Sequence, residues 1–135
     1  MPFGPDHTPF DAIGGEPAVR ALVTHFYDRM DRDPALASTR ALYPPDTTES
    51  RAKLADFLCG WLGGPPLYVE KHGHPRLRAR HLPFAISARE RDQWLACMQA
   101  AMDEQGVAGE LRAFLNERFA HVADFMRNQP PRGEG

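Results

Sequence analysis

The sequence predicts an all-α fold, and three observations support that prediction. Apolar residues recur at helical spacing in four long stretches of the 135-residue chain. Capping residues, glycines and prolines stand where these stretches begin or end. No segment alternates apolar and polar residues as a half-buried strand does, and no internal repeat or coiled-coil heptad is visible.

A short helix and a long helix are expected first. Thr8 is a suitable N-cap and Pro9 suits the first helical position, so the short helix should continue to Ile13. The glycine pair that follows ends it. The long helix should run from Glu16 to about Asp33. Its apolar face consists of Val19, Leu22, Val23, Phe26, Tyr27 and Met30.

A shorter helical piece, a proline corner and a second long helix come next. Pro34 opens the piece, which ends near Leu42, and the Tyr-Pro-Pro-Asp run at 43–46 forms the corner. Capping residues around 46–48 start the long helix, and a Gly-Gly-Pro-Pro run at 63–66 ends it. The apolar stripe of this helix consists of Leu54, Phe57, Leu58, Trp61 and Leu62.

Two further long helices follow a broken segment of short helices and loop at 67–81. Ser87 and Glu90 fit a capping box, and the helix that they open ends by Gly106. The last helix spans roughly 109–128. The inward residues expected on these two helices are Trp94, Cys97, Met98, Ala101 and Met102, then Leu111, Phe114, Leu115, Val122, Phe125 and Met126.

The chain has the length of one domain, which we place at 1–128, with a disordered Pro/Gly-rich tail at 129–135. Its formal net charge of −2 argues against nucleic acid or an anionic membrane as partner, since both require a basic surface. No signal peptide and no apolar run of transmembrane length is visible. Cys59 and Cys97 lie in apolar stretches and do not look like a disulfide framework, so we expect a reducing compartment, the cytoplasm.

His81 stands at the end of a short basic helical stretch, where Pro83 forces the chain to turn. Leu77, Leu82 and Phe84 flank it. A neutral imidazole in an apolar wall is what a haem iron requires on its proximal side. A lone histidine on an apolar face is more often a satisfied core or surface group, so this run alone leaves both interpretations open.

The surroundings of His81 favour a bound cofactor. The segment 63–87 is too long, and too broken by proline and glycine, for a link in a regular four-helix bundle. Long irregular stretches in compact domains are usually functional. A wall that cannot pack tightly by itself could be completed by a flat apolar cofactor.

Short motifs follow one another along the whole chain, and their order and spacing are informative as a set. They are 10–15 (Phe-Asp-Ala-Ile-Gly-Gly), Phe26-Tyr27, 42–44, Phe57-Leu58, 61–65, 73–75, Leu77-Arg78, Arg80-His81, Pro83-Phe84, 90–95 and Cys97-Met98. In this order and spacing, the chain from Phe10 to about Asn128 resembles the group II truncated haemoglobins. The resemblance implies a truncated globin-like fold, a two-over-two helical sandwich that encloses haem b.

The resemblance also implies roles for individual residues. His81 is the expected iron ligand, and Tyr27, Tyr43 and Trp94 are expected on the distal side, where they stabilise a bound ligand. The residues expected to contact the haem are Leu54 and Phe57 on its distal face, Phe84 beside His81, Lys53, Tyr68 and Arg80 at its propionates, and Ser50 at the distal gate.

The chemistry of the three distal residues supports these roles. Tyrosine and tryptophan combine an apolar body with a hydrogen-bond donor, and donors in a dry pocket retain bound dioxygen, which carries partial negative charge. An aromatic residue on a helical stripe is usually part of the core, so each residue taken alone has that simpler interpretation. Loss of one donor should cost roughly 1–3 kcal/mol of ligand stabilisation.

Two functions are open for a haem protein of this kind. It could act on dioxygen, NO or peroxide as an NO dioxygenase or a peroxidase-like enzyme; because the chain has no flavin or nicotinamide fingerprint, turnover would need a separate reductase. It could instead bind dioxygen reversibly, with CO as a further ligand, for transport, storage or sensing. We expect a monomer or a homodimer.

A haem-free alternative is a helical protein that binds two iron ions or zinc. Such proteins use paired Glu-x-x-His motifs or clusters of His and Cys at characteristic spacings. The sequence contains neither pattern, which argues against this alternative.

Overall fold

The computed structural model describes residues 3–4, 6–76 and 86–126, and these ranges contain helices and no named strand. The helices are α1 (Pro9–Ile13), α2 (Gly15–Arg32), η1 (Pro34–Leu36), α3 (Ala37–Arg40), α4 (Thr48–Trp61), α5 (Leu67–His72), α7 (Ala88–Gln105) and α8 (Gly109–Met126). The all-α prediction is confirmed. No helix in the described ranges has the length and apolar character that crossing a bilayer requires.

The helix ends follow the capping chemistry of the sequence. The Thr8 hydroxyl accepts a hydrogen bond from the Asp11 N–H at 3.1 Å, and the Asp11 carboxylate accepts one from the Thr8 N–H. Ser87 and Glu90 form the same reciprocal capping box at the start of α7. Such caps satisfy backbone N–H groups that a helix leaves unpaired. At the end of α7, Gly106 adopts the left-handed conformation with φ 77°.

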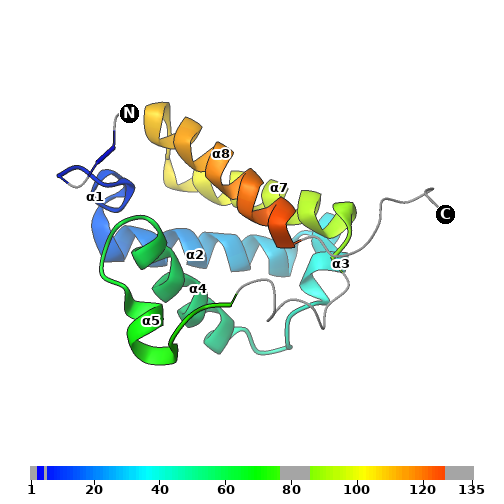
Figure 1. Ribbon diagram of the computed structural model, residues 1–135. Coiled ribbons are helices and arrows are strands. Elements are labelled where there is room, and N and C mark those ends of the chain that lie inside the picture. The colour runs from blue at the N-terminus through cyan, green and yellow to red at the C-terminus, as the bar shows by residue number, and fades with distance from the viewer. Residues whose placement is uncertain (1–2, 5, 77–85, 127–135) are drawn as a thin grey trace.

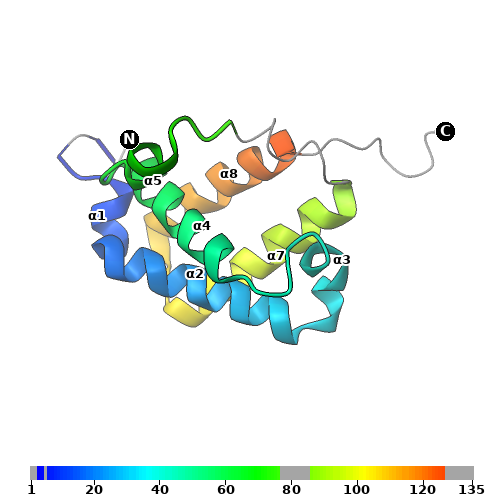
Figure 2. The ribbon, with the colours of Figure 1, turned by 90° about the horizontal axis from the view of Figure 1, so that it is seen from below.

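Two pairs of long helices lie one over the other. α4 packs against α2, α8 packs against α7, and the contact of α2 with α7 joins the two pairs. Figure 1 shows α4 and α5 on one side of α2 and α7 with α8 on the other side. Seen from below, α4 runs obliquely across α2 (Figure 2). The predicted two-over-two helical sandwich is therefore confirmed.

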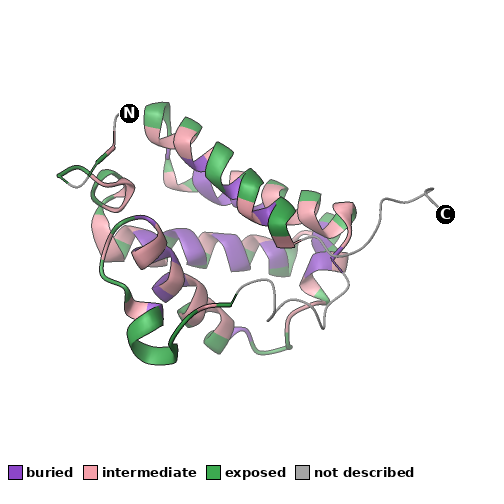
Figure 3. Ribbon diagram, in the orientation of Figure 1, coloured by how far each residue is buried: buried purple, intermediate pink, exposed green. Residues whose placement is uncertain are grey.

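The core lies between α2 and α7. Leu22 and Phe26 on α2, and Met98 and Met102 on α7, are fully buried. Figure 3 shows the buried face of α2 continuing along most of its length. The face is continuous because apolar residues that recur every 3.6 residues lie on one side of a helix.

One predicted core residue is wrong and another was missed, both on α8. Phe125 is 51% exposed, whereas Phe119, which the sequence prediction did not include, is 1% exposed. The inward stripe runs through Leu115, Phe119, Val122 and Met126, spaced three or four residues apart. Phe125 lies one residue off that stripe, on the side of the helix that faces outward.

Two glycines let α1 press against the end of α4. The Phe10 N–H donates to the Leu62 carbonyl at 2.9 Å. A Cβ on Gly64 would lie 2.6 Å from the Phe10 ring, and Gly63 has φ 99°, so neither position accepts a side chain without a shift of its neighbours. The 10–15 and 61–65 motifs therefore form one packing unit.

Candidate functional site

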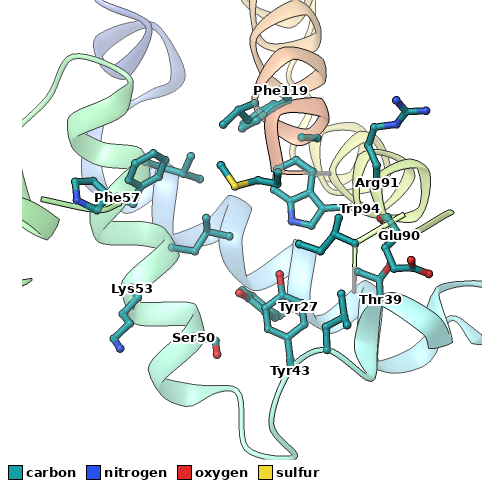
Figure 4. Close-up of a pocket in the computed structure, with 18 of the residues that line it drawn as sticks. Tyr27, Thr39, Tyr43, Ser50, Lys53, Phe57, Glu90, Arg91, Trp94 and Phe119 are labelled. Carbon is teal, nitrogen blue, oxygen red and sulfur yellow. Dashed lines mark hydrogen bonds between the residues drawn. The ribbon is translucent and has the colours of Figure 1, made fainter. Parts of the chain in front are cut away.

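A pocket of about 380 Å³ opens between α4 on one side and α7 and α8 on the other (Figure 4). This volume is within the range of roughly 300–1,000 Å³ that is typical of cofactor and ligand pockets. The apolar part of its lining includes Leu42, Leu54, Phe57, Leu58, Trp61, Ile86, Phe119, Val122, Ala123 and Met126. Its polar side chains are Tyr27, Thr39, Tyr43, Ser50, Lys53, Tyr68, Glu90, Arg91 and Trp94.

Three hydrogen-bonding aromatic side chains converge on one wall of this pocket. Tyr27 comes from α2, Tyr43 from the proline corner and Trp94 from α7, and Figure 4 shows their polar ends close together. The rings of Tyr27 and Tyr43 meet edge to face, with centroids 5.4 Å apart. We call these three residues the donor cluster.

Burial keeps the tyrosines of the donor cluster protonated. Burial raises the pKa of Tyr27, and the hydrogen bond that it makes with Tyr43 raises that pKa further. Burial also raises the pKa of Tyr43, although hydrogen bonds with Tyr27 and Trp94 act in the opposite direction. Both hydroxyl groups therefore retain their protons and can donate hydrogen bonds at physiological pH.

Packing and charge fix the donor cluster in place. Phe26 lies against both Tyr27 and Trp94, with ring centroids 5.1 and 5.3 Å away. The Arg51 guanidinium lies over the Tyr27 ring at 5.4 Å and binds Asp28 at 2.9 Å. A preorganised donor loses little entropy when it meets a ligand, so this support favours tight binding.

Buried threonine Thr39 fastens α3 to α7 at the edge of the pocket. Its hydroxyl donates to Gln93 Oε1 at 2.9 Å, and its backbone N–H donates to the same oxygen at 3.0 Å. Thr39 is 2% exposed, so both of these polar groups need such a partner. The bonds hold the chain just before the proline corner that carries Tyr43.

Polar and charged side chains stand at two edges of the pocket. Ser50 and Lys53 lie on α4, whereas Glu90 and Arg91 lie on α7, on the opposite side in Figure 4. Lys53 Nζ pairs with Glu49 at 2.8 Å, an exposed pair that an incoming carboxylate can displace at little cost. Lys53 is thus suited to meet a carboxylate at the pocket mouth.

Asp56 forms a buried ionic junction beneath α5 that the sequence analysis did not single out. Its side chain is 3% exposed and binds Arg20 of α2 at 2.8 Å and Lys71 of α5 at 2.9 Å. Burial alone would raise the pKa of Asp56, but the hydrogen bonds from Lys71 and Arg20 outweigh it and lower the pKa. The junction holds α5, and with it Tyr68, against the wall of the pocket.

Neither cysteine belongs to the pocket lining. Cys59 and Cys97 are buried and free of disulfide bonds. The Cys97 thiol donates to the Phe26 carbonyl at 3.0 Å, and burial raises the pKa of Cys97 to about 12. Such a thiol stays protonated and acts as a small core residue.

The structure brings together every predicted site residue that lies in its described part. These residues are Tyr27, Tyr43, Ser50, Lys53, Leu54, Phe57, Tyr68 and Trp94. Three predicted site residues, His81, Arg80 and Phe84, and the tail at 129–135 lie outside the described residues.

Trp61 and α8 contribute to this pocket, which helical periodicity did not predict. Trp61 was predicted as a core residue of α4, yet it lines the pocket and stacks on Phe119 with centroids 5.2 Å apart. A stricter count of the helical period from Leu115 would have found Phe119. No local signal in the sequence reveals that the two aromatic rings face the same cavity.

The residues present fit a flat, mostly apolar group with acidic edges and a small polar ligand. Apolar walls from α4 and α8 face the cavity, and Lys53 stands at its mouth. The donor cluster faces the interior of the pocket, where a bound apolar group would exclude water and strengthen a hydrogen bond to an acceptor. The donor set therefore suits the cofactor class expected from the sequence.

Comparison with known proteins agrees with this geometry. The model of the family described as bacterial-like globin matches residues 8–128. The chain is 48% identical over 123 residues to the group 2 truncated haemoglobin YjbI of Bacillus subtilis, covering 91% of this chain and 90% of that protein.

Two solved structures have closely similar folds. The group II 2-on-2 haemoglobin of the plant pathogen Agrobacterium tumefaciens has a TM-score of 0.88 and 48% identity, covering 91% of this chain and 95% of that one. The truncated oxygen-avid haemoglobin of Bacillus subtilis has a TM-score of 0.82 and 48% identity, covering 90% and 99% of the two chains.

Proposed function

Because the chain belongs to the group II truncated haemoglobins, we propose that its pocket holds haem b and binds dioxygen and other small diatomic ligands, including NO and CO. Membership of this family implies a haem cofactor and a small gaseous ligand. We further propose that the bound ligand is used to detoxify nitric oxide or peroxide in the cytoplasm, with electrons from a separate reductase.

The donor cluster is the observation that carries this proposal. Tyr27, Tyr43 and Trp94 converge in one apolar pocket, and both hydroxyls stay protonated. When bound, haem would supply an iron atom that binds the diatomic ligand. The donor cluster then retains a ligand that carries partial negative charge, because hydrogen bonds are strong where water is excluded.

The remaining residues hold the cofactor in this proposal. His81 would provide the imidazole that binds the iron, and Phe84 would contact the haem beside it. Leu54 and Phe57 form the apolar wall on α4, and Ser50 stands at the gate. Lys53, Tyr68 and Arg80 bind the two haem carboxylates.

Absorption spectroscopy of the purified protein tests the cofactor assignment. We expect a Soret band that shifts when carbon monoxide is added to the reduced protein. His81→Gly should lose the band, or should show it only when free imidazole is added. His121→Ala, which removes an exposed histidine of α8, should leave the band intact. A protein that stays colourless with added haemin contradicts the proposal.

Ligand kinetics separate catalysis from the alternative, reversible oxygen storage or sensing. The donor cluster favours slow release of dioxygen, which suits consumption of NO or peroxide on the bound ligand more than delivery of oxygen. The test is to measure oxygen release together with the rate of NO or peroxide consumption. Rapid release with negligible consumption would favour the storage role. In Bacillus subtilis, the similar haemoglobin of known structure is described as oxygen-avid.

A further inference from the structure

Tyr43 differs from the other two members of the donor cluster because it does not lie on a helix. Tyr27 and Trp94 belong to α2 and α7, whose backbone hydrogen bonds hold them in place. Tyr43 is followed by Pro44 and Pro45, which have no N–H group to donate. The direction of the Tyr43 side chain therefore depends on the contacts that fix the backbone of this corner.

The side chain of Arg40 holds the corner through three backbone carbonyls. Its Nη1 donates to the Tyr43 carbonyl at 3.4 Å and to the Pro44 carbonyl at 3.0 Å, and its Nη2 donates to the Pro45 carbonyl at 3.0 Å. The Arg40 carbonyl in turn accepts from the Tyr43 N–H at 3.1 Å. Arg40 thus binds three consecutive residues of the corner, two of which cannot donate a backbone hydrogen bond themselves.

Asp31 connects Arg40 to the helix that carries Tyr27. The Arg40 Nε donates to Asp31 Oδ1 at 2.7 Å. Asp31 stands four residues after Tyr27 on α2, and residues at this spacing lie on one face of a helix. The backbone of Tyr43 is therefore tied to the face of α2 from which Tyr27 projects.

Arg51 of α4 holds the other end of the corner and the second oxygen of Asp31. Its Nη2 donates to Asp31 Oδ2 at 3.2 Å, and its Nε donates to Thr47 Oγ1 at 3.0 Å. Thr47 is buried, so its position is closely defined. The segment 43–47 is thus held at both ends, and Arg40 holds the end that carries Tyr43.

The contacts of Arg40 require a guanidinium. Arg40 uses Nε for Asp31 and both Nη atoms for the carbonyls, and its planar fork fixes the angle between these bonds. A lysine ammonium keeps the charge but is a single point on a flexible stem, so it cannot make all of these contacts at once. Arg40→Lys therefore removes the geometry of the fork while it retains the charge.

We propose that Arg40 is a positioning residue for the donor cluster: by binding Asp31 and the carbonyls of 43–45 together, it fixes the direction in which the Tyr43 hydroxyl meets a bound ligand. This inference rests on the proposed haem binding and deepens it. Arg40 does not line the pocket, so it acts through Tyr43. The hydroxyl of Tyr43 makes hydrogen bonds with Tyr27 and Trp94, so a shift of the corner changes the whole donor cluster.

Infrared spectroscopy of the carbon monoxide complex tests the direction of the donors. The frequency of the C–O stretch reports the hydrogen bonds around the bound ligand. We expect one narrow band from the wild type, and from Arg40→Lys a broader band or a second band at higher frequency, because part of the molecules then lacks the hydrogen bond from Tyr43. Arg29→Lys is the matched control, since Arg29 donates to Asp33 at 3.2 Å and not to the corner, and it should leave the band unchanged.

Oxygen release separates positioning from general support of the fold. Arg40→Lys should speed release several-fold when Tyr43 is present and should have no effect in Tyr43→Phe, which has no hydroxyl to misdirect. A residue that only supported the fold would speed release equally in both backgrounds. Asp31→Asn, which removes the charge that anchors Arg40, should act in the same direction with a smaller effect.

Nuclear magnetic resonance of protein labelled with carbon-13 at tyrosine Cζ follows Tyr43 itself. The chain has three tyrosines, so each signal can be assigned with a phenylalanine variant. Arg40→Lys should shift or broaden the Tyr43 signal and leave the Tyr68 signal unchanged.

Two results would overturn the proposal. One is a Tyr43 signal and a C–O band that are the same in Arg40→Lys and the wild type. The other is an equal acceleration of oxygen release with and without the Tyr43 hydroxyl. A protein without a Soret band would instead refute haem binding, and the tyrosine signals would still test whether Arg40 positions Tyr43.

Discussion

Trp94 shows how one side chain limits what the pocket can do. An indole donates a hydrogen bond and cannot accept one, so Trp94 can stabilise an acceptor at any pH. We expect Trp94→Phe to speed oxygen release by about ten- to a hundred-fold, the equivalent of roughly 1–3 kcal/mol. Stopped-flow measurement of release checks this, and Trp61→Phe, which removes the other indole of the pocket, is the control. Equal release from Trp94→Phe and the wild type would exclude Trp94 as a donor.

The raised pKa values of Tyr27 and Tyr43 predict how stability depends on alkaline pH. Unfolded tyrosine ionises near pH 10, whereas both folded residues keep their protons at that pH because burial raises their pKa. The free energy of unfolding should therefore fall as pH rises above about 10, since the unfolded chain releases protons that the folded chain retains. Urea denaturation between about pH 8 and pH 11 should show that the free energy of unfolding falls less steeply in the double variant Tyr27→Phe/Tyr43→Phe than in the wild type. An equally steep fall in the double variant and the wild type would contradict the prediction.

At the scale of the helices, Asp56 fastens α5 to α2 and α4. Its carboxylate is buried and meets two cations, so Asp56→Asn should lower the free energy of unfolding by about 2 kcal/mol at pH 7. Because the pKa of Asp56 is lowered in the folded protein, its contribution is present above about pH 4 and disappears as pH falls further.

Denaturation of Asp56→Asn and the wild type at several pH values measures this contribution. The difference in the free energy of unfolding between the two proteins should become smaller as pH falls below about 4. Glu16→Gln is the matched control, because Glu16 binds the same Arg20 but is 45% exposed, and should cost less than about 1 kcal/mol. A constant difference between Asp56→Asn and the wild type across this pH range would show that the charge of Asp56 is irrelevant.

Helices were predictable from the sequence where local chemistry determines them. The N-cap at Thr8 and the capping box at Ser87 formed as predicted, since a cap needs only residues within the same turn. The error at Phe125 and the omission of Phe119 both fall on α8, a helix whose apolar residues lie on more than one side, so that periodicity does not determine a single inward face. Asp56 could not be predicted in the same way, because its partners are 36 and 15 residues away.

The candidate site also contains features that local sequence patterns predict and features that they do not. Tyr27, Tyr43 and Trp94 come from three separate elements, and only the resemblance to a known family predicted that they would meet. Helical periodicity alone assigned Tyr27 and Trp94 to the core. The convergence of their polar groups depends on how α2 crosses the pair formed by α7 and α8, which is a property of tertiary packing.

For the molecule as a whole, the pocket is a gap in the packing between the two layers. Its lining comes from α2, α4, α5, α7 and α8, so a group that fills it contacts most of the structure at once. Empty apolar space in a protein forfeits contacts that a filled core would make. The occupied state should therefore be more stable than the empty one.

Removal of haem provides the corresponding test. A ligand present at about a thousand times its Kd stabilises the folded state by about 4 kcal/mol, which for a domain of this size raises Tm by about 10 °C or more. Calorimetry of the protein before and after haem extraction should show that difference. Iron-free protoporphyrin fills the apolar walls without forming an axial bond, so its Tm should lie between the two. Without added imidazole, haem should raise the Tm of His81→Gly no further than protoporphyrin raises that of the wild type if His81 is the axial ligand, and should raise it to the wild-type value if another residue holds the iron.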